Sequence, residues 1–287
     1  MNHLSASFGE LKLVRTEAGR ERSVVRLENG ASFGGEELAI CAGPCAIESR
    51  EQIDATAAAV ARSGANVLRG GAFKPRTSPY SFQGLGAEAL AMMRASADEH
   101  GLAVVTEVLD PRDAQRVAAS ADMLQIGARN MQNTALLTAV GEAGKPVLLK
   151  RGLCATVDEW LHAAEYIALT GNDRIVLCER GVRSFDPSTR NLLDLAVIPL
   201  LAGLTHLPVI VDPSHGTGMA RLVEPMSLAG VAAGAAGIIV EVHPNPAAAV
   251  SDGMQSLTFA QFATLMEHLP EVAAAVGRRL PAAPLPA

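Results

Sequence analysis

The stretch NVLRGGAFKPRTSPYSFQG, residues 66–84, is the part of the sequence from which the rest can be interpreted. A short apolar run ends at Arg69, a pair of glycines follows, and two further cations, Lys74 and Arg76, stand within the next five positions. Glycines let backbone N–H groups approach a ligand closely, prolines stiffen a loop, and long cationic side chains converge readily on one phosphate or carboxylate. The stretch predicts a strand followed by an anion-binding loop, with a solvated basic loop as the alternative.

Short apolar runs alternate with longer amphipathic ones on both sides of this stretch. The alternation repeats eight times, which is typical of strands that are each followed by a helix. A closed (β/α)8 TIM barrel is favoured over an open doubly wound sheet, because eight such strands are more easily closed than left with free edges. The expected strands are Leu38–Ala42, Asn66–Leu68, Ala103–Thr106, Met123–Ile126, Val147–Leu149, Arg174–Leu177, Val209–Val211 and Gly237–Val240, and the expected helices are Arg50–Ser63, Gly86–His100, Pro111–Ser120, Asn133–Ala143, Thr156–Thr170, Arg190–Leu204, Pro225–Gly234 and Phe259–Leu269.

The two ends of the chain differ from this pattern. Residues 1–35 contain an alternating run and an Asn29-Gly30 dipeptide, which together predict a short N-terminal β-hairpin that caps the barrel. The catalytic barrel is assigned to residues 36–275. The proline-rich residues 276–287 are predicted to be a disordered tail.

The composition restricts the classes of function. With 287 residues, 49% hydrophobic and 19% charged, the chain can bury a large core. It has no run of about twenty apolar residues and a polar N-terminus, so neither a membrane span nor a signal peptide is expected, and a cytoplasmic location is predicted. A net charge of −6 argues against nucleic acid as a partner. The four cysteines lack C-x-x-C spacing and are expected to be reduced thiols.

Chemically active side chains follow the ends of the predicted strands, where the active site of such a barrel lies. Any one of them is equally compatible with a solvated side chain. Together, six cations gathered in an acidic protein would repel one another unless an anionic partner offset their charge, so small and strongly anionic ligands are expected. The cations are Arg69, Lys74, Arg76, Arg129, Lys150 and Arg180, and they share this end of the barrel with Glu107, Gln125, Glu179, Asp212, His215, Glu241 and His243.

A metal-binding cluster is expected at the same mouth. Cys45, His215, Glu241 and Asp252 offer a thiolate, an imidazole and two carboxylates, a mixed set that suits Mn²⁺, Fe²⁺, Co²⁺ or Zn²⁺ better than Ca²⁺ or Mg²⁺. The first, seventh and eighth strands are neighbours in a closed barrel, so these remote positions would meet. The spacing leaves open that Cys45 is a small buried thiol and that His215 is a hydrogen-bonded loop histidine.

Seven segments of the chain resemble the 3-deoxy-D-arabino-heptulosonate 7-phosphate (DAHP) synthase family. The resemblance is to its microbial type Iβ group, which shares its barrel with 3-deoxy-D-manno-octulosonate 8-phosphate synthase, and it covers residues 38–269 in order. The segments are AGPCAIES (42–49), LRGGAFKPRTSPYSFQG (68–84), QIGARN (125–130), LKRG (149–152), ERGVR (179–183), VDPSHG (211–216) and IVEVHPNP (239–246).

The resemblance implies the first step of the shikimate pathway and of aromatic amino-acid biosynthesis: condensation of phosphoenolpyruvate with erythrose 4-phosphate, with release of phosphate. Pro75-Arg76 favours this acceptor over arabinose 5-phosphate. Lys74 would protonate the alkoxide, and Glu107 and the metal-linked Asp252 are candidates for activating water. Carried over residue by residue, the metal ligands are Cys45, His215, Glu241 and Asp252, the phosphoenolpyruvate contacts are Arg129, Lys150 and Arg180 with Arg69, Lys74 and Glu107, and the aldose phosphate contacts are Arg76 and Thr77.

The resemblance also carries expectations about assembly and control. A homotetramer is usual for these barrels. Regulated type Iβ enzymes carry a fused ferredoxin-like domain or chorismate mutase module, and the first 35 residues are too short for either. We therefore expect no inhibition of this chain by Phe, Tyr or Trp alone, with control from a separate chorismate mutase partner.

Three departures from the family pattern, at Cys154, Asp186 and Met219-Ala220, concern substrate-loop detail. Two alternatives remain at this point. One is an octulosonate 8-phosphate synthase, and the other is a catalytically silent scaffold barrel.

Overall fold

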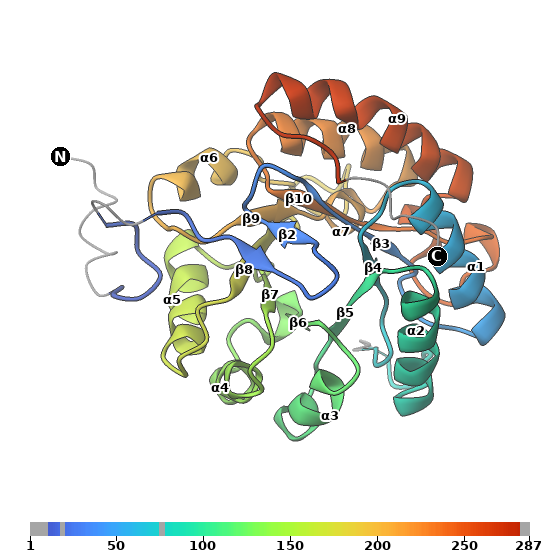
Figure 1. The fold of residues 1–287 in the computed structure, drawn as a ribbon, viewed down its shortest axis with the longest axis horizontal. Coiled ribbons are helices and arrows are strands. Elements are labelled where there is room, and N and C mark those ends of the chain that lie inside the picture. Colours follow the sequence, from blue (N-terminus) through green and yellow to red (C-terminus); the bar gives the residue numbers. More distant parts are fainter. Residues whose placement is uncertain (1–10, 18–20, 75–77, 282–287) are drawn as a thin grey trace.

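The eight predicted strands are present and close into a parallel barrel, in the order β10-β3-β4-β5-β6-β7-β8-β9, which confirms the (β/α)8 prediction. A computed structural model of the chain describes residues 11–17, 21–74 and 78–281. The helices ring the sheet on its outside (Figure 1). The strands are β3 (Ala39–Gly43), β4 (Val67–Arg69), β5 (Ala103–Glu107), β6 (Met123–Ile126), β7 (Val147–Lys150), β8 (Ile175–Glu179), β9 (Val209–Val211) and β10 (Gly237–Glu241), and the helices are α1 (Arg50–Arg62), α2 (Ala87–Glu99), α3 (Ala114–Ala118), α4 (Thr134–Glu142), α5 (Val157–Ala168), α6 (Val197–Ala202), α7 (Pro213–Thr217), α8 (Ala220–Ala232) and α9 (Phe259–Ala275), with short 3₁₀ turns η2 (Pro111–Asp113), η3 (Ala128–Asn130), η4 (Pro246–Ala248) and η5 (Gly253–Gln255).

Alternate residues of each strand face the interior of the barrel. These inward residues are apolar toward the amino ends of the strands and polar or charged at their carboxyl ends. In β5, Val105 belongs to the interior apolar cluster, and the next inward residue, Glu107, lines a cavity at the carboxyl end of the strands. In β7, Leu148 and Lys150 show the same change. The other pairs of this kind are Val67 and Arg69, Met123 and Gln125, Ile210 and Asp212, and Ile239 and Glu241.

The predicted N-terminal hairpin is confirmed and closes the lower end of the barrel. Strands β1 (Val25–Arg26) and β2 (Ser32–Phe33) pair antiparallel. Their apolar side chains, among them the fully buried Phe33, join the same cluster as the inward residues of the barrel strands. Figure 1 shows the hairpin lying across the ring of strands. The extension therefore supplies the floor of the barrel core and leaves the opposite end open.

The segment that precedes the hairpin is held to the outside of the barrel. The carboxylate of Glu165 on α5 accepts hydrogen bonds from the backbone N–H groups of residues 12, 13 and 14. Arg15 forms an isolated antiparallel bridge with Thr205. The alternating run at residues 11–15 therefore pairs only through this isolated bridge.

Several predicted helix limits are wrong. The helix expected from 190 begins only at Val197, because Glu179 accepts hydrogen bonds from the N–H groups of Gly181 and Asp194 and holds the intervening segment as a loop. The helix expected over 111–120 is divided into η2 and α3. Helix α7, a single turn capped by Asp212, was not predicted.

The end of the chain packs further than the predicted boundary at 275. Arg279 accepts a hydrogen bond from Leu38 N–H and donates its own N–H to the carbonyl of Glu36. Residues 276–281 of the predicted tail thus lie against the start of the barrel. Residues 282–287 are outside the described part of the chain.

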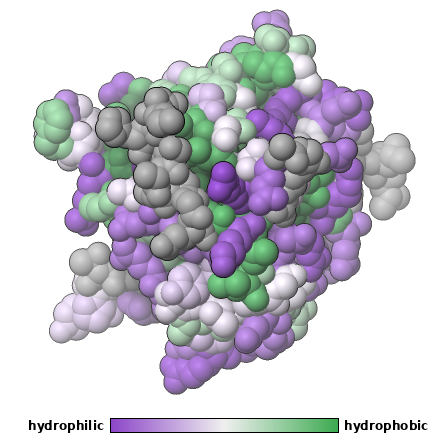
Figure 2. All heavy atoms as spheres, turned by 90° about the vertical axis from the view of Figure 1, so that its left-hand side faces the viewer, coloured by the Kyte–Doolittle hydropathy of each residue, from purple (hydrophilic) through white to green (hydrophobic). Residues whose placement is uncertain are grey.

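The surface beside the N-terminal segment carries apolar patches separated by polar side chains (Figure 2). Leu13 on the N-terminal segment, Tyr166 on α5 and Leu169 just after α5 are exposed. Within the described residues, no helix combines the length and apolar character needed to cross a bilayer.

Candidate active site

A cavity of about 500 Å³ opens at the carboxyl end of the barrel strands. Its wall is strongly cationic. Of the sequence-predicted residues, it contains Arg69, Lys74, Glu107, Gln125, Arg129, Lys150, Arg180, His215 and Asp252, and it adds Arg183, Arg190, Asn191, Ser78 and Ser81 among others. Such a concentration of positive charge at the mouth of an acidic protein favours small polyanions.

The loop after β4 uses its two glycines differently from the prediction. Their N–H groups are already bonded, Gly70 to the carbonyl of Val105 and Gly71 to that of Cys45, so the expected approach of free amides to a ligand is wrong. A Cβ on Gly71 would lie 2.7 Å from both the Cys45 oxygen and Cδ of Lys74. Glycine is required here because it lets the Lys74 side chain pass across the backbone into the cavity.

Arg180 is a buried cation of this wall that has no carboxylate bonded to it among the described residues. Its side chain is buried, and its single direct hydrogen bond among the described residues is a long one of 3.5 Å to the neighbouring Gly181 carbonyl. Burial lowers the pKa of Arg180, and the neighbouring charges of Arg190 and Arg129 act in the same direction, against Asp212. A buried guanidinium without a carboxylate partner is a favourable place for an anionic ligand.

Asp212, which follows β9, links the cationic wall to His215 in α7. It accepts the ammonium of Lys150 in a buried ion pair, and its Oδ2 lies 2.8 Å from Nδ1 of His215. Burial would raise the pKa of Asp212, but the charges of His215 and Lys150 outweigh it and hold the pKa well below its ordinary value. The carboxylate thereby fixes the imidazole with Nε2 directed inward, 3.3 Å from Oε1 of Glu241.

Glu241 is fully buried and held from several sides. Arg69 donates to its Oε1 at 2.9 Å, and Gln255 donates to its Oε2 at 2.6 Å. Burial would raise the pKa of Glu241, but His215 and then Arg69 lower it below the ordinary value. The carboxylate is therefore kept ionised at the bottom of the cavity.

The predicted metal ligands come together, although they come from opposite ends of the chain. Cys45, Glu241 and Asp252 place one donor atom each within 4.8 Å of one another, and His215 adjoins them through its contact with Glu241. The Cys45 thiol donates to Asp252 Oδ2 at 3.1 Å, and Lys74 Nζ lies 3.0 Å from the same sulfur. Burial, followed by Glu241, raises the pKa of Cys45 to about 12.

Asp252 has an unusual backbone. Among the described residues it is the one non-glycine residue with positive φ, at 51°. An aspartate tolerates this left-handed conformation better than most residues, and such conformations are concentrated at functional sites. Burial would raise the pKa of Asp252, but the hydrogen bond from Cys45 and the charge of His215 lower it to about 2.

Glu107, at the end of β5, lies near several cavity cations, among them Lys74 and Lys150. Burial raises the pKa of Glu107, although Lys74 and Lys150 oppose the shift. A Cβ on Gly127 would fall 1.9 Å from Glu107 Oε1, so a glycine at this position gives the carboxylate its room. A carboxyl group with a raised pKa, set in a cationic cavity, is suited to proton transfer.

The structure does not describe two of the predicted residues, and it adds two arginines to the cavity wall. Arg76 and Thr77 lie outside the described residues. Arg183 and Arg190 are not among the candidates named from the sequence, and Arg190 falls at the start of a predicted helix. The proline and paired small polar residues in Asp186-Pro187-Ser188-Thr189 were a signal for a loop there.

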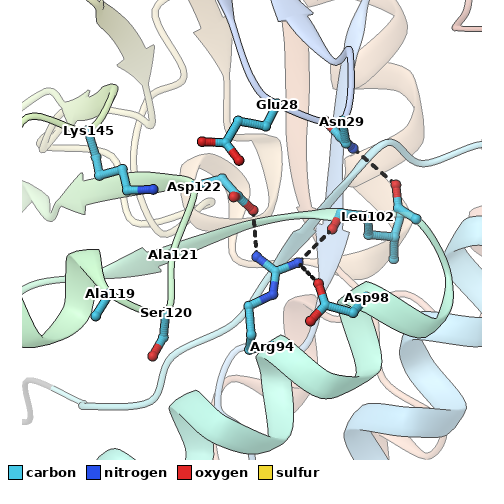
Figure 3. A pocket seen from close by; sticks show the side chains of 11 residues that line it. Glu28, Asn29, Arg94, Asp98, Leu102, Ala119, Ser120, Ala121, Asp122 and Lys145 are labelled. Carbon is cyan, nitrogen blue, oxygen red and sulfur yellow. Dashed lines mark hydrogen bonds and ion pairs between the residues drawn. The ribbon is translucent and has the colours of Figure 1, made fainter.

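A second cavity, of about 410 Å³, lies near the opposite end of the barrel (Figure 3). Its central Arg94 pairs with Asp98 at 2.6 Å and Asp122 at 2.7 Å, and donates to the carbonyl of Leu102. Figure 3 shows these groups converging on one guanidinium. Since Arg94 is already bonded by protein atoms, this cluster holds α2 to the barrel rather than offering an open cation.

A closed barrel of eight parallel strands with a cationic cavity at the carboxyl ends defines a protein of the (β/α)8 barrel class with a site suited to phosphorylated small molecules. The comparisons with known proteins narrow this class. The chain belongs to the DAHP synthetase I family, whose model matches residues 16–277.

Relatives and solved structures agree with this assignment. The chain is 51% identical to the phospho-2-dehydro-3-deoxyheptonate aldolase of Thermotoga maritima over 93% of this chain and 78% of that protein. It is 34% identical to a 2-dehydro-3-deoxyphosphooctonate aldolase of Rhodopseudomonas palustris, over 84% of this chain and 90% of the relative.

Two solved structures from Thermotoga maritima superpose closely. The crystal structure of its DAHP synthase gives a TM-score of 0.92 at 49% identity, covering 95% of this chain and 79% of that one. A truncated form of 3-deoxy-D-arabino-heptulosonate 7-phosphate synthase gives 0.89 at 45% identity, covering 95% of this chain and all of the other.

Proposed function

We propose that this chain condenses phosphoenolpyruvate with erythrose 4-phosphate to give DAHP and inorganic phosphate, as the first step of aromatic amino-acid biosynthesis. The single observation that supports this most is the cavity itself, in which buried and half-buried cations face a cluster of thiol, imidazole and carboxylate donors. Identity of 51% to the heptonate enzyme, against 34% to the octonate enzyme, favours the four-carbon acceptor.

The cationic wall would bind phosphoenolpyruvate. Arg129, Lys150 and Arg180 lie at or just after the ends of three neighbouring strands, β6, β7 and β8, while Arg69 ends β4 and Lys74 is on the loop after it. Arg180 would gain from an anion, because its guanidinium is buried and has no carboxylate partner among the described residues. Arg76 and Thr77 are proposed, from the family resemblance alone, to hold the phosphate of the aldose.

The reaction requires two proton-handling steps. C3 of phosphoenolpyruvate bonds to the aldehyde carbon of the acceptor, and the resulting alkoxide takes a proton, for which Lys74 is our candidate donor. Water then adds at C2, and the bond between C2 and the phosphate oxygen breaks to release phosphate. Glu107 and Asp252 are the candidates for accepting the proton of that water.

The residues at the bottom of the cavity fit a divalent metal ion. His215 donates from Nδ1 to Asp212, so the lone pair on its Nε2 faces the Glu241 carboxylate at 3.3 Å, an arrangement that a cation would relieve. Cys45, His215, Glu241 and Asp252 would hold the ion, and their mixed sulfur, nitrogen and oxygen donors suit Mn²⁺, Fe²⁺, Co²⁺ or Zn²⁺. When bound, such an ion would supply Lewis-acid polarisation of the aldehyde oxygen.

Further proposals rest on the sequence pattern and on the family resemblance. We infer a catalytic barrel at residues 36–275, a homotetrameric assembly, a cytoplasmic location, and a separate chorismate mutase chain as a partner.

Turnover with both aldose phosphates tests the function. The purified protein, stripped of metal by chelator and then resupplied with Mn²⁺, is assayed for phosphate release from phosphoenolpyruvate. We expect release with erythrose 4-phosphate and little with arabinose 5-phosphate. Preference for arabinose 5-phosphate would assign the octulosonate reaction instead, and no release with either acceptor would indicate a silent barrel.

A further inference from the structure

Arg190 and Gln255 connect the two carboxylates of the metal cluster from outside it. Arg190 Nη1 donates to Oε1 of Gln255 at 2.7 Å and to Oδ1 of Asp252 at 3.2 Å. Gln255 Nε2 in turn donates to Glu241 at 2.6 Å. One guanidinium therefore reaches both acidic residues, one directly and one through an amide.

The hydrogen bonds from Arg190 through Gln255 to Glu241 allow a single orientation of the Gln255 amide. Arginine donates only and an ionised carboxylate accepts only, so Gln255 must turn its oxygen to Arg190 and its nitrogen to Glu241. Gln255 is buried at 2% exposure, which makes loss of either bond costly. Its bond to Oε2 thus leaves Oε1 of Glu241 to face Arg69 and His215.

Arg190 and Gln255 lie on two different segments, and each segment is held in place by its own bonds. The backbone N–H of Arg190 donates to the carbonyl of Thr217 at 3.0 Å. Next to it, Asn191 bonds the carbonyls of Gly216 and His215 through its backbone and side chain. Gln255 ends the η5 turn that begins after Asp252. The loop after β8 is therefore anchored against the segment that carries His215, and from there Arg190 reaches the loop after β10.

We propose that Arg190 and Gln255 are positioning residues that hold Asp252 and Glu241 in the orientation needed to ligate the metal ion. This inference rests on the proposed metal site. Arg190 also lines the substrate cavity, so the same side chain joins the metal cluster to the surface that an anionic substrate would touch.

Positioning and simple charge predict opposite effects of removing Arg190. A nearby positive charge opposes binding of a cation, so its removal would by itself tighten metal binding. Loss of positioning would weaken binding, and outer partners of ligating carboxylates typically contribute 10- to 100-fold in affinity. The sign of the change therefore separates the two explanations.

The test measures Co²⁺ affinity of metal-free protein by the thiolate-to-cobalt absorption band. We expect Arg190→Met and Gln255→Met each to raise the dissociation constant about tenfold or more. Arg190→Lys, which keeps the charge but cannot bond both partners in the same way, should also weaken binding. The matched control is Arg183→Met, which removes a cavity cation from the same loop and should leave affinity unchanged or slightly tighter.

Three results would count against the proposal. Wild-type affinity in both methionine variants would overturn the positioning role while leaving the metal site intact. Equal weakening in the Arg183 control would assign the effect to the loop in general. Absence of the cobalt–thiolate band in the wild-type protein would overturn the metal site and, with it, the positioning role. Arg190 is partly exposed, so its variants should fold, which circular dichroism would verify.

Discussion

The Cys45 thiol donates to the Asp252 carboxylate at 3.1 Å, across 207 positions of sequence. The contact joins the loop after the first barrel strand to the loop after the last one. It exists because the barrel closes between β3 and β10, which pair along five residues. The cluster is therefore sensitive both to the chemistry of these two side chains and to the closure of the sheet.

Replacement of Cys45 by serine tests the metal assignment. The change removes the sulfur donor while keeping a small side chain that can still hydrogen-bond Asp252. We expect metal content to fall and turnover to drop by about 100-fold or more, because a hydroxyl is a poor substitute for a thiolate with a borderline metal. Elemental analysis and phosphate-release kinetics measure both effects. Cys154→Ser, at an exposed cysteine, is the control; normal metal content and full turnover in Cys45→Ser would refute the assignment.

Asp252 should make the stability of the metal-free protein dependent on pH. Its folded-state pKa is about 2, below the ordinary 3.8, so its contribution is fully present above about pH 4 and is lost as the pH falls toward 2. With allowance for its partial exposure, we expect Asp252→Asn to lower stability by about 1 to 2 kcal/mol at pH 6 and by less as the pH drops. Denaturant unfolding in chelator at several pH values measures this. A difference that stayed constant from pH 6 to pH 3 would contradict the expectation.

Arg180 should favour substrate binding at the expense of stability. Its guanidinium is buried without a carboxylate partner among the described residues, so Arg180→Met should stabilise the ligand-free protein by about 1 kcal/mol, or roughly 2 °C. The same change should raise KM for phosphoenolpyruvate at least about tenfold. Thermal unfolding with and without inorganic phosphate checks both parts, since phosphate should stabilise the wild type more than the variant. A variant that melts lower without ligand would show that Arg180 is structural.

The hairpin should matter for stability more than for chemistry. Phe33 is fully buried in the floor of the barrel, at the end opposite the cavity. Phe33→Ala is expected to cost about 3 to 5 kcal/mol through the cavity it leaves, with kcat of the folded enzyme little changed. Val24→Ala, at an exposed neighbouring position, should change stability by less than about 0.5 kcal/mol. Equal changes in the free energy of unfolding for the two variants, measured with denaturant, would contradict the role of the hairpin as the floor of the barrel core.

Local pattern was sufficient for much of the fold. Strand β6 was predicted at Met123–Ile126 and observed there, because its apolar run is bounded by residues that end strands on both sides. The helix limits were less predictable. The segment before Val197 has helical composition, yet the bonds of Glu179 to Gly181 and Asp194 outweigh that preference.

The sequence by itself determined the barrel and the candidate residues at its mouth, since a period of two along each strand already assigns Arg69 and Glu241 to the inner face near the carboxyl end. Only the tertiary structure decided how these residues are used. It showed that the amide of Gly71 is bonded within the protein, and that Arg190 and Gln255 support the acidic residues of the cluster. The physical reason is that hydrophobic periodicity acts over a few neighbouring residues, whereas hydrogen bonds between loops depend on which chain ends the closed sheet brings together.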